Sequence, residues 1–81
     1  MNDYTNLELY EIARAISDDW RGPYFGAVPY LQAMRGLRTL DDWYGAESAR
    51  TVITYFLSNA GTWRGPVARA IKAELKGRIG R

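Results

Sequence analysis

Apolar residues recur at the spacing of one helical face in three separate stretches of this 81-residue chain. An α-helix turns once in about 3.6 residues, so side chains three and four positions apart share a face. The stripes are Leu9, Ile12, Ala13, Ile16 and Trp20, then Ala49, Val52, Ile53, Phe56 and Ala60, and finally Val67, Ile71 and Leu75. The pattern predicts an all-α single domain over residues 1–81, a small bundle of three longer helices plus one or two short helices.

The three stripes also supply the predicted core, because each helix can bury only its apolar face. The expected core residues are Leu9, Ile12, Ile16, Val52, Ile53, Phe56, Val67, Ile71 and Leu75. The stretch from Thr51 to Phe56 is rich in β-branched and aromatic residues, which also suit a strand. We favour a helix there, because the apolar positions do not alternate.

Capping residues and glycines suggest the helix boundaries. Thr5 with Glu8 has the spacing of a capping box and is expected to start the first helix, which Gly22 and Pro23 end. A short helix is expected from about Ala27 to Arg35.

Thr39 is expected to cap a helical turn over residues 40–44, and the third long helix is expected over residues 46–59. Thr62 should cap the last helix, with Pro66 tolerated in its first turn because the amides there have no partner within the helix.

The chain contains no histidine and no cysteine. It therefore lacks the commonest general base, the commonest metal ligand and any means of forming a disulfide. The adjacent carboxylates Asp18 with Asp19 and Asp41 with Asp42 do not face one another at consecutive positions, and are better read as capping groups. We expect no enzyme activity, no catalytic residue, no metal and no cofactor.

No apolar run in the sequence approaches the roughly 20 residues that a membrane helix needs. The first ten residues are acidic and polar, unlike a secretory signal. The expected location is the cytoplasm, without membrane contact.

Charge is unevenly distributed along the chain. Residues 1–47 carry four arginines against eight acidic residues, a net charge of −4, whereas residues 48–81 carry a net charge of +6. The basic residues of the last helix could bind nucleic acid through Arg64, Arg69, Lys72, Lys76 and Arg78. Two other interpretations stay open: a solvated helix end with favourable dipole interactions, or pairing with the acidic half.

Aromatic residues are dense and fall into two groups. Trp20, Phe56 and Trp63 lie on or beside the apolar stripes, so we expect them in the core. Residues in short or irregular segments are better candidates for a protein interface, where tyrosine and tryptophan are enriched. These candidates are Tyr24, Phe25, Tyr30, Trp43 and Tyr44.

Three stretches carry a resemblance to known proteins: YFGAVPYL at residues 24–31, YFLSNA continuing into TWRG over residues 55–65, and AIKAEL at residues 70–75. Together they resemble small uncharacterised proteins of actinobacterial phages and prophages. The resemblance implies a bacterial cytoplasm and an accessory or regulatory protein, and it assigns no role to any residue.

The favoured function is non-enzymatic binding of a host or phage protein through the exposed aromatic residues. The alternative is nucleic-acid binding by the basic C-terminal helix. The first requires exposed aromatic rings and the second requires a basic face without internal partners.

Overall fold

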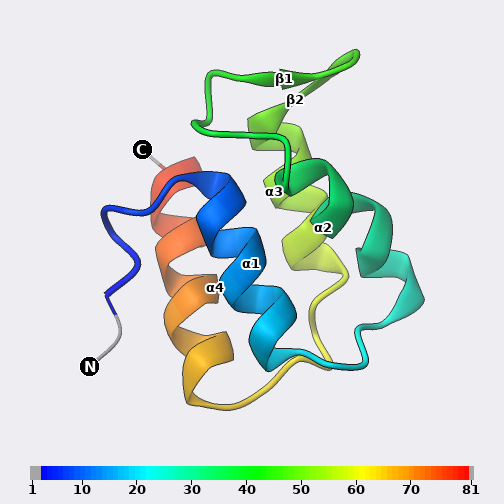
Figure 1. The fold of residues 1–81 in the computed structure, drawn as a ribbon, viewed down its shortest axis with the longest axis vertical. Coiled ribbons are helices and arrows are strands. Elements are labelled where there is room, and N and C mark those ends of the chain that lie inside the picture. Colours follow the sequence, from blue (N-terminus) through cyan, green and yellow to red (C-terminus); the bar gives the residue numbers. More distant parts are fainter. Residues whose placement is uncertain (1–2, 81) are drawn as a thin grey trace.

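The computed structural model describes residues 3–80, which form four α-helices and one short β-hairpin (Figure 1). The elements are α1 (Leu9–Asp19), the 3-10 turn η1 (Phe25–Ala27), α2 (Val28–Met34), β1 (Trp43–Tyr44), β2 (Glu47–Ser48), α3 (Ala49–Ser58) and α4 (Pro66–Ile79). α1 packs against α2 and α4, and α3 packs against the same two helices. The fold is therefore mostly helical, as predicted, but the antiparallel hairpin means that it is not all-α.

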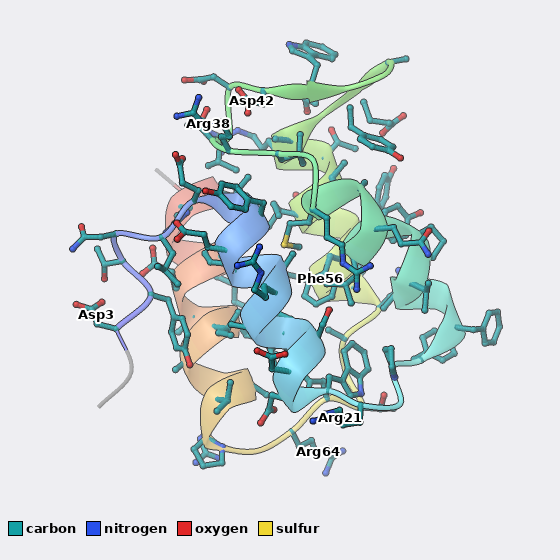
Figure 2. All side chains as sticks on the ribbon, viewed as in Figure 1. Asp3, Arg21, Arg38, Asp42, Phe56 and Arg64 are labelled. Carbon is teal, nitrogen blue, oxygen red and sulfur yellow. The ribbon has the colours of Figure 1, made fainter. Side chains whose placement is uncertain are left out.

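The core lies between the four helices, where Phe56 is central in Figure 2. Eight of the nine predicted core residues are buried, and Val67 packs against them at the edge. The short helix α2 and the turn after it add Leu31, Met34 and Leu37. The core is therefore larger than the three stripes alone indicate. No helix within residues 3–80 combines the length and apolarity of a membrane span.

A cluster of three aromatic rings closes the end of the core where α1 stops. The rings of Trp20 and Trp63 stack with centroids 5.6 Å apart, and the ring of Phe56 meets both edge-on at 6.3 Å. Trp63 Nε1 donates a hydrogen bond to Asp19 Oδ2 at 2.8 Å, and Lys72 Nζ donates to the Trp63 carbonyl oxygen at 2.6 Å. The core assignment of the three aromatic residues is confirmed.

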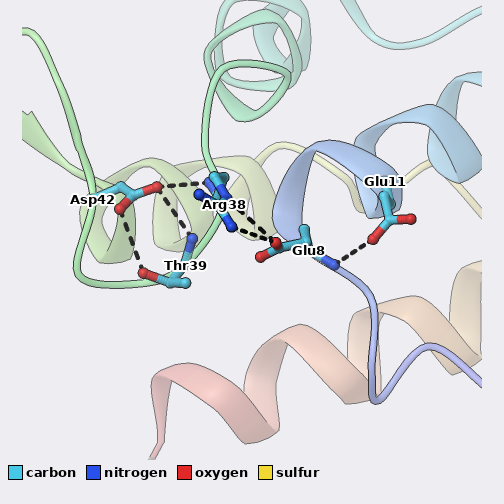
Figure 3. Close-up of polar contacts among 5 residues, drawn as sticks. All are labelled: Glu8, Glu11, Arg38, Thr39 and Asp42. Carbon is cyan, nitrogen blue, oxygen red and sulfur yellow. Dashed lines mark hydrogen bonds and ion pairs between the residues drawn. The ribbon is translucent and has the colours of Figure 1, made fainter.

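The start of α1 differs from the prediction. Glu8, not Thr5, is the N-cap, and the Glu11 carboxylate accepts a hydrogen bond from the Glu8 amide at 2.9 Å (Figure 3). The first amides of the helix, those of Leu9 and Tyr10, donate to backbone carbonyls of residues 37 and 38. The helix begins where this tertiary contact supplies acceptors, so the local Thr5 signal does not decide its position.

The segment predicted as a capped helical turn after Thr39 is instead the hairpin. Trp43 pairs with Ser48 and Tyr44 with Glu47, leaving a two-residue loop that begins at Gly45. Gly45 has φ +60°, and a positive φ at the first loop position alone fits a type II′ turn. Residues 46–48 are thereby taken out of the predicted third helix.

The last two helices also begin at other residues than predicted. Ser48 caps α3 by accepting a hydrogen bond from the Thr51 amide at 3.1 Å, so the helix starts at Ala49. The N-cap of α4 is Gly65, whose φ of +110° favours glycine, and Thr62 is not a cap. The predicted boundaries of α2 agree with the structure to within a residue.

Replacing Glu11 with alanine should lower the free energy of unfolding by about 1 kcal/mol, because the carboxylate that accepts from the Glu8 amide is lost. Chemical denaturation measures this change. Thr5→Ala is the matched control and should leave the midpoint unchanged. A larger effect from Thr5→Ala than from Glu11→Ala would restore the sequence-based boundary.

Replacing Asp19 with alanine should cost about 1 to 3 kcal/mol of stability, because the indole N–H of buried Trp63 loses its partner. Asp18→Ala removes the neighbouring carboxylate, which makes no hydrogen bond within residues 3–80, and should cost little. Equal thermal midpoints for the two variants would show that the Asp19–Trp63 hydrogen bond does not stabilise the fold.

Candidate functional site: an aromatic surface over α2 and α3

Two pairs of aromatic side chains lie on η1 with the residue before it, and on α2 and α3. We call the four together the aromatic surface: Tyr24, Phe25, Tyr30 and Tyr55. The rings of Tyr24 and Phe25 lie 4.8 Å apart, and those of Tyr30 and Tyr55 lie 5.5 Å apart across the α2–α3 contact. A Cβ atom on Gly26 would come within 2.8 Å of Asn59 Oδ1, so the turn that carries Tyr24 and Phe25 lies directly against the end of α3.

These rings contribute little to the core. Phe25 is 79% exposed, Tyr55 is 49% exposed and Tyr24 is 44% exposed, whereas Tyr30 is half-buried. Removing such rings should therefore cost far less stability than removing Phe56, which is fully buried.

The segments that build the surface are free of charge. Residues 22–34 and residues 51–63 contain no acidic or basic side chain, and α2 and α3 bring the two segments together. The centres of protein interfaces are depleted in charged residues and enriched in aromatic ones. The composition of this face therefore matches that of an interface centre.

A small recess adjoins the aromatic surface. It has a volume of about 160 Å³ and is lined by Tyr24, Ser58, Asn59, Gly61 and Thr62. Its lining contains hydroxyl and amide groups and no charged group, so it suits a neutral side chain of a partner.

Trp43 and Tyr44 were also predicted for the interface. They lie on β1, apart from the three other predicted residues, Tyr24, Phe25 and Tyr30. Both are at least half exposed. In Figure 1 the hairpin lies at one end of the molecule, whereas η1 lies at the opposite end of α2. The structure thus divides the five predicted residues into the aromatic surface and a separate hairpin pair.

Tyr55 was missed as a site residue by the sequence reasoning. It belongs to the solvent side of α3, between Thr54 and Ser58, and not to the apolar stripe. A large aromatic residue on a helix's polar face was the available signal.

The predicted basic surface is partly occupied by internal bonds. Arg78 Nε lies 2.7 Å from Glu74 Oε2, and its Nη2 donates to the carbonyl oxygens of Tyr4 and Thr5. Lys72 is held against Trp63, and burial, reinforced by the positive charges of Lys76 and Arg64, lowers the pKa of its ammonium group. Arg78 and Lys72 therefore support the fold and are not free to bind phosphates.

The other three predicted basic residues, Arg64, Arg69 and Lys76, are exposed and make no side-chain hydrogen bond or ion pair within residues 3–80. The α3 and α4 helices are joined by seven residues, 59–65, so they do not form the tight turn of a helix-turn-helix. The side chain of Arg78 reaches the acidic half by donating to the backbone carbonyls of Tyr4 and Thr5.

Of the paired aspartates after α2, Asp42 serves a structural purpose. Asp42 accepts hydrogen bonds from the backbone amides of Arg38 and Thr39, and these bonds hold the pKa of its carboxyl group below the usual value (Figure 3). Arg38 in turn pairs with Glu8 at 3.2 Å. Among residues 3–80, no group of acidic side chains is arranged to hold a metal ion.

Compared with protein-family models, with curated proteins and with solved structures, the chain matches none of them. The chemistry of its own surface is therefore the basis for assigning a function.

Replacing Arg78 with alanine should destabilise the fold by about 1 to 3 kcal/mol, because Glu74 and the carbonyls of residues 4 and 5 lose their donor. Arg69→Ala is the control from the exposed side of the same helix and should have little effect. Thermal denaturation of both variants checks the prediction. It is wrong if the two variants melt together.

Proposed function

We propose that this chain is a non-enzymatic protein-binding domain whose contact residues are those of the aromatic surface. The observation that carries the proposal is the cluster of exposed rings on a face built from two charge-free segments. The expected partner is a protein that presents an apolar patch, because a charged surface would lose hydration on this face without gaining a counter-charge.

The geometry supports tight binding at a small number of positions. Phe25 is the most exposed large apolar residue among those described, and its ring packs against that of Tyr24. The ring of Tyr55 packs against that of Tyr30 in the same way. Rings that are already held in place lose little conformational entropy when a partner covers them. Tyr24, Phe25 and Tyr55 are therefore the expected hot spots.

The biological setting is part of the proposal. Two of the three stretches that resemble phage and prophage proteins, residues 24–31 and 55–65, contain the whole aromatic surface. This coincidence supports an accessory or regulatory protein that acts in a bacterial cytoplasm on a host or phage protein.

Nucleic-acid binding by α4 has less support. Two of its five proposed contact residues, Lys72 and Arg78, are engaged within the molecule. The other three, Arg64, Arg69 and Lys76, stay free for phosphate contacts.

The test is capture of partners on the immobilised protein from an actinobacterial lysate treated with nuclease, followed by affinity measurement with the purified partner. Tyr24→Ala and Phe25→Ala should each weaken binding by about 2 kcal/mol, or about 30-fold in Kd. Isothermal titration calorimetry provides the Kd values.

Two control variants sharpen the result. Arg69→Ala should leave the Kd unchanged, and Trp43→Ala reports whether the hairpin pair belongs to the interface. Loss of all captured protein on nuclease treatment, or retention of the same partner by the Tyr24→Ala/Phe25→Ala double variant with unchanged Kd, would contradict the proposal.

A further inference from the structure

Three arginines of the acidic half gather at one groove between α1 and α2. Tyr10, Arg14, Ser17 and Arg21 follow each other at steps of three and four, along one flank of α1 and just past its end. Arg35, the C-cap residue of α2, reaches across and donates to Ser17 Oγ at 3.0 Å. The packing of the two helices thus places Arg14, Arg21 and Arg35 along one groove.

The groove contains two adjoining cavities, which share Ser17 and Arg35. One has a volume of about 300 Å³ and is also lined by Tyr10 and Arg14. The other, of about 230 Å³, has an apolar wall that includes Trp20, Val28 and Leu31, with Arg21 at its edge. Among the residues that the structure describes, no acidic side chain lines either cavity.

Among residues 3–80, the three guanidinium groups have no carboxylate partner. Within residues 3–80, Arg14 makes no side-chain hydrogen bond, Arg21 donates only to the Asp18 carbonyl oxygen, and Arg35 only to the Ser17 hydroxyl. Arg38 and Arg78, by contrast, each pair with a glutamate. The charge of the groove is therefore available to an external anion.

We propose that this groove binds a single strand of nucleic acid, with Arg14, Arg35 and Arg21 contacting successive phosphates. Grooves that bind single strands combine positive charge along the backbone with surfaces on which bases stack. Tyr10, which is partly exposed, offers such a ring in one cavity, and the apolar wall beside Trp20 offers a second base site.

The shape and lining of the groove favour this ligand over two others. Duplex DNA is read by elements that protrude into its grooves, whereas these arginines line a recess between helices. An acidic peptide would use the arginines but not the aromatic and apolar walls, which have no counterpart in a carboxylate side chain. The site is separate from the aromatic surface, so it does not depend on the function proposed above.

The test is fluorescence anisotropy with a labelled oligothymidylate of about 12 nucleotides, starting at about 50 mM salt. The logarithm of the affinity should fall against the logarithm of the salt concentration with a slope near −2, taking about 0.7 for each of about three contacts. The double variant Arg14→Ala/Arg21→Ala should weaken binding at least about tenfold. It should also reduce the magnitude of the slope to below about 1.

Tyr10→Ala should weaken binding about fivefold or more while leaving the slope unchanged, since stacking carries no counterion release. Circular dichroism and thermal melting confirm that each variant is folded. Arg35 joins the two helices, so Arg14 and Arg21 carry the test even if Arg35→Ala does not fold.

Matched controls separate this groove from other surfaces. The double variant Arg69→Ala/Lys76→Ala removes two positive charges from α4, as many as Arg14→Ala/Arg21→Ala removes from the groove. Apart from the effect of the lower net charge, it should change the affinity less than about twofold. Tyr24→Ala/Phe25→Ala should leave oligothymidylate binding intact, whatever its effect on a protein partner.

Four outcomes would overturn the proposal. They are no binding at low salt, an equal loss in the α4 double variant, tighter binding of a duplex of the same length, and equal competition by a polyglutamate peptide of matched charge.

Discussion

The stacking of Trp20 on Trp63 is the contact that joins the two halves of this small domain. Trp20 ends α1 and Trp63 lies in the loop before α4, so their stack, with Phe56 against both rings, connects three helices in one place. Asp19 binds the indole nitrogen and Lys72 binds the carbonyl of Trp63. With few residues to bury, a domain of this size depends heavily on such large rings. The Trp-Arg-Gly-Pro sequences at 20–23 and 63–66 meet here through their tryptophans.

Charge along the chain and charge on the surface are different properties in this protein. The first 47 residues are acidic overall, yet three of their four arginines face one groove that lacks acidic lining. Several of the acids are used elsewhere: Glu8 and Glu11 at the start of α1, Asp19 at Trp63 and Asp42 in the loop before the hairpin. The basic last helix, conversely, uses Arg78 and Lys72 internally. A functional argument from net charge alone therefore included two cations, Lys72 and Arg78, that the fold already uses.

In the candidate site, too, some features follow from the sequence and others depend on the tertiary structure. Exposure of Tyr24, Phe25, Trp43 and Tyr44 followed from their place in short segments without helical periodicity. Their separation into two groups, and the pairing of Tyr30 with Tyr55, depend on how α2 crosses α3 and could not be read from spacing. Likewise, the hairpin at Trp43 and Tyr44 competes locally with a capped helical turn, and the Asp42 hydrogen bonds to residues 38 and 39 favour the hairpin.

The sequence by itself determined the helices and most of the core. A repeat of about 3.6 residues in apolar positions is a local property, and packing acts on helical faces that this repeat already defines. The apolar residues of the three stripes are buried as their spacing predicts: Leu9, Ile12, Ala13 and Ile16, then Val52, Ile53 and Phe56, and finally Ile71 and Leu75. Only the tertiary structure supplied the acceptors for the first amides of α1, since those of Leu9 and Tyr10 donate to residues 38 and 37. It also decided which cations are free, because Tyr4, which accepts from Arg78, and Glu8, which pairs with Arg38, lie far from them in the sequence. Those partners exist only once the helices have met.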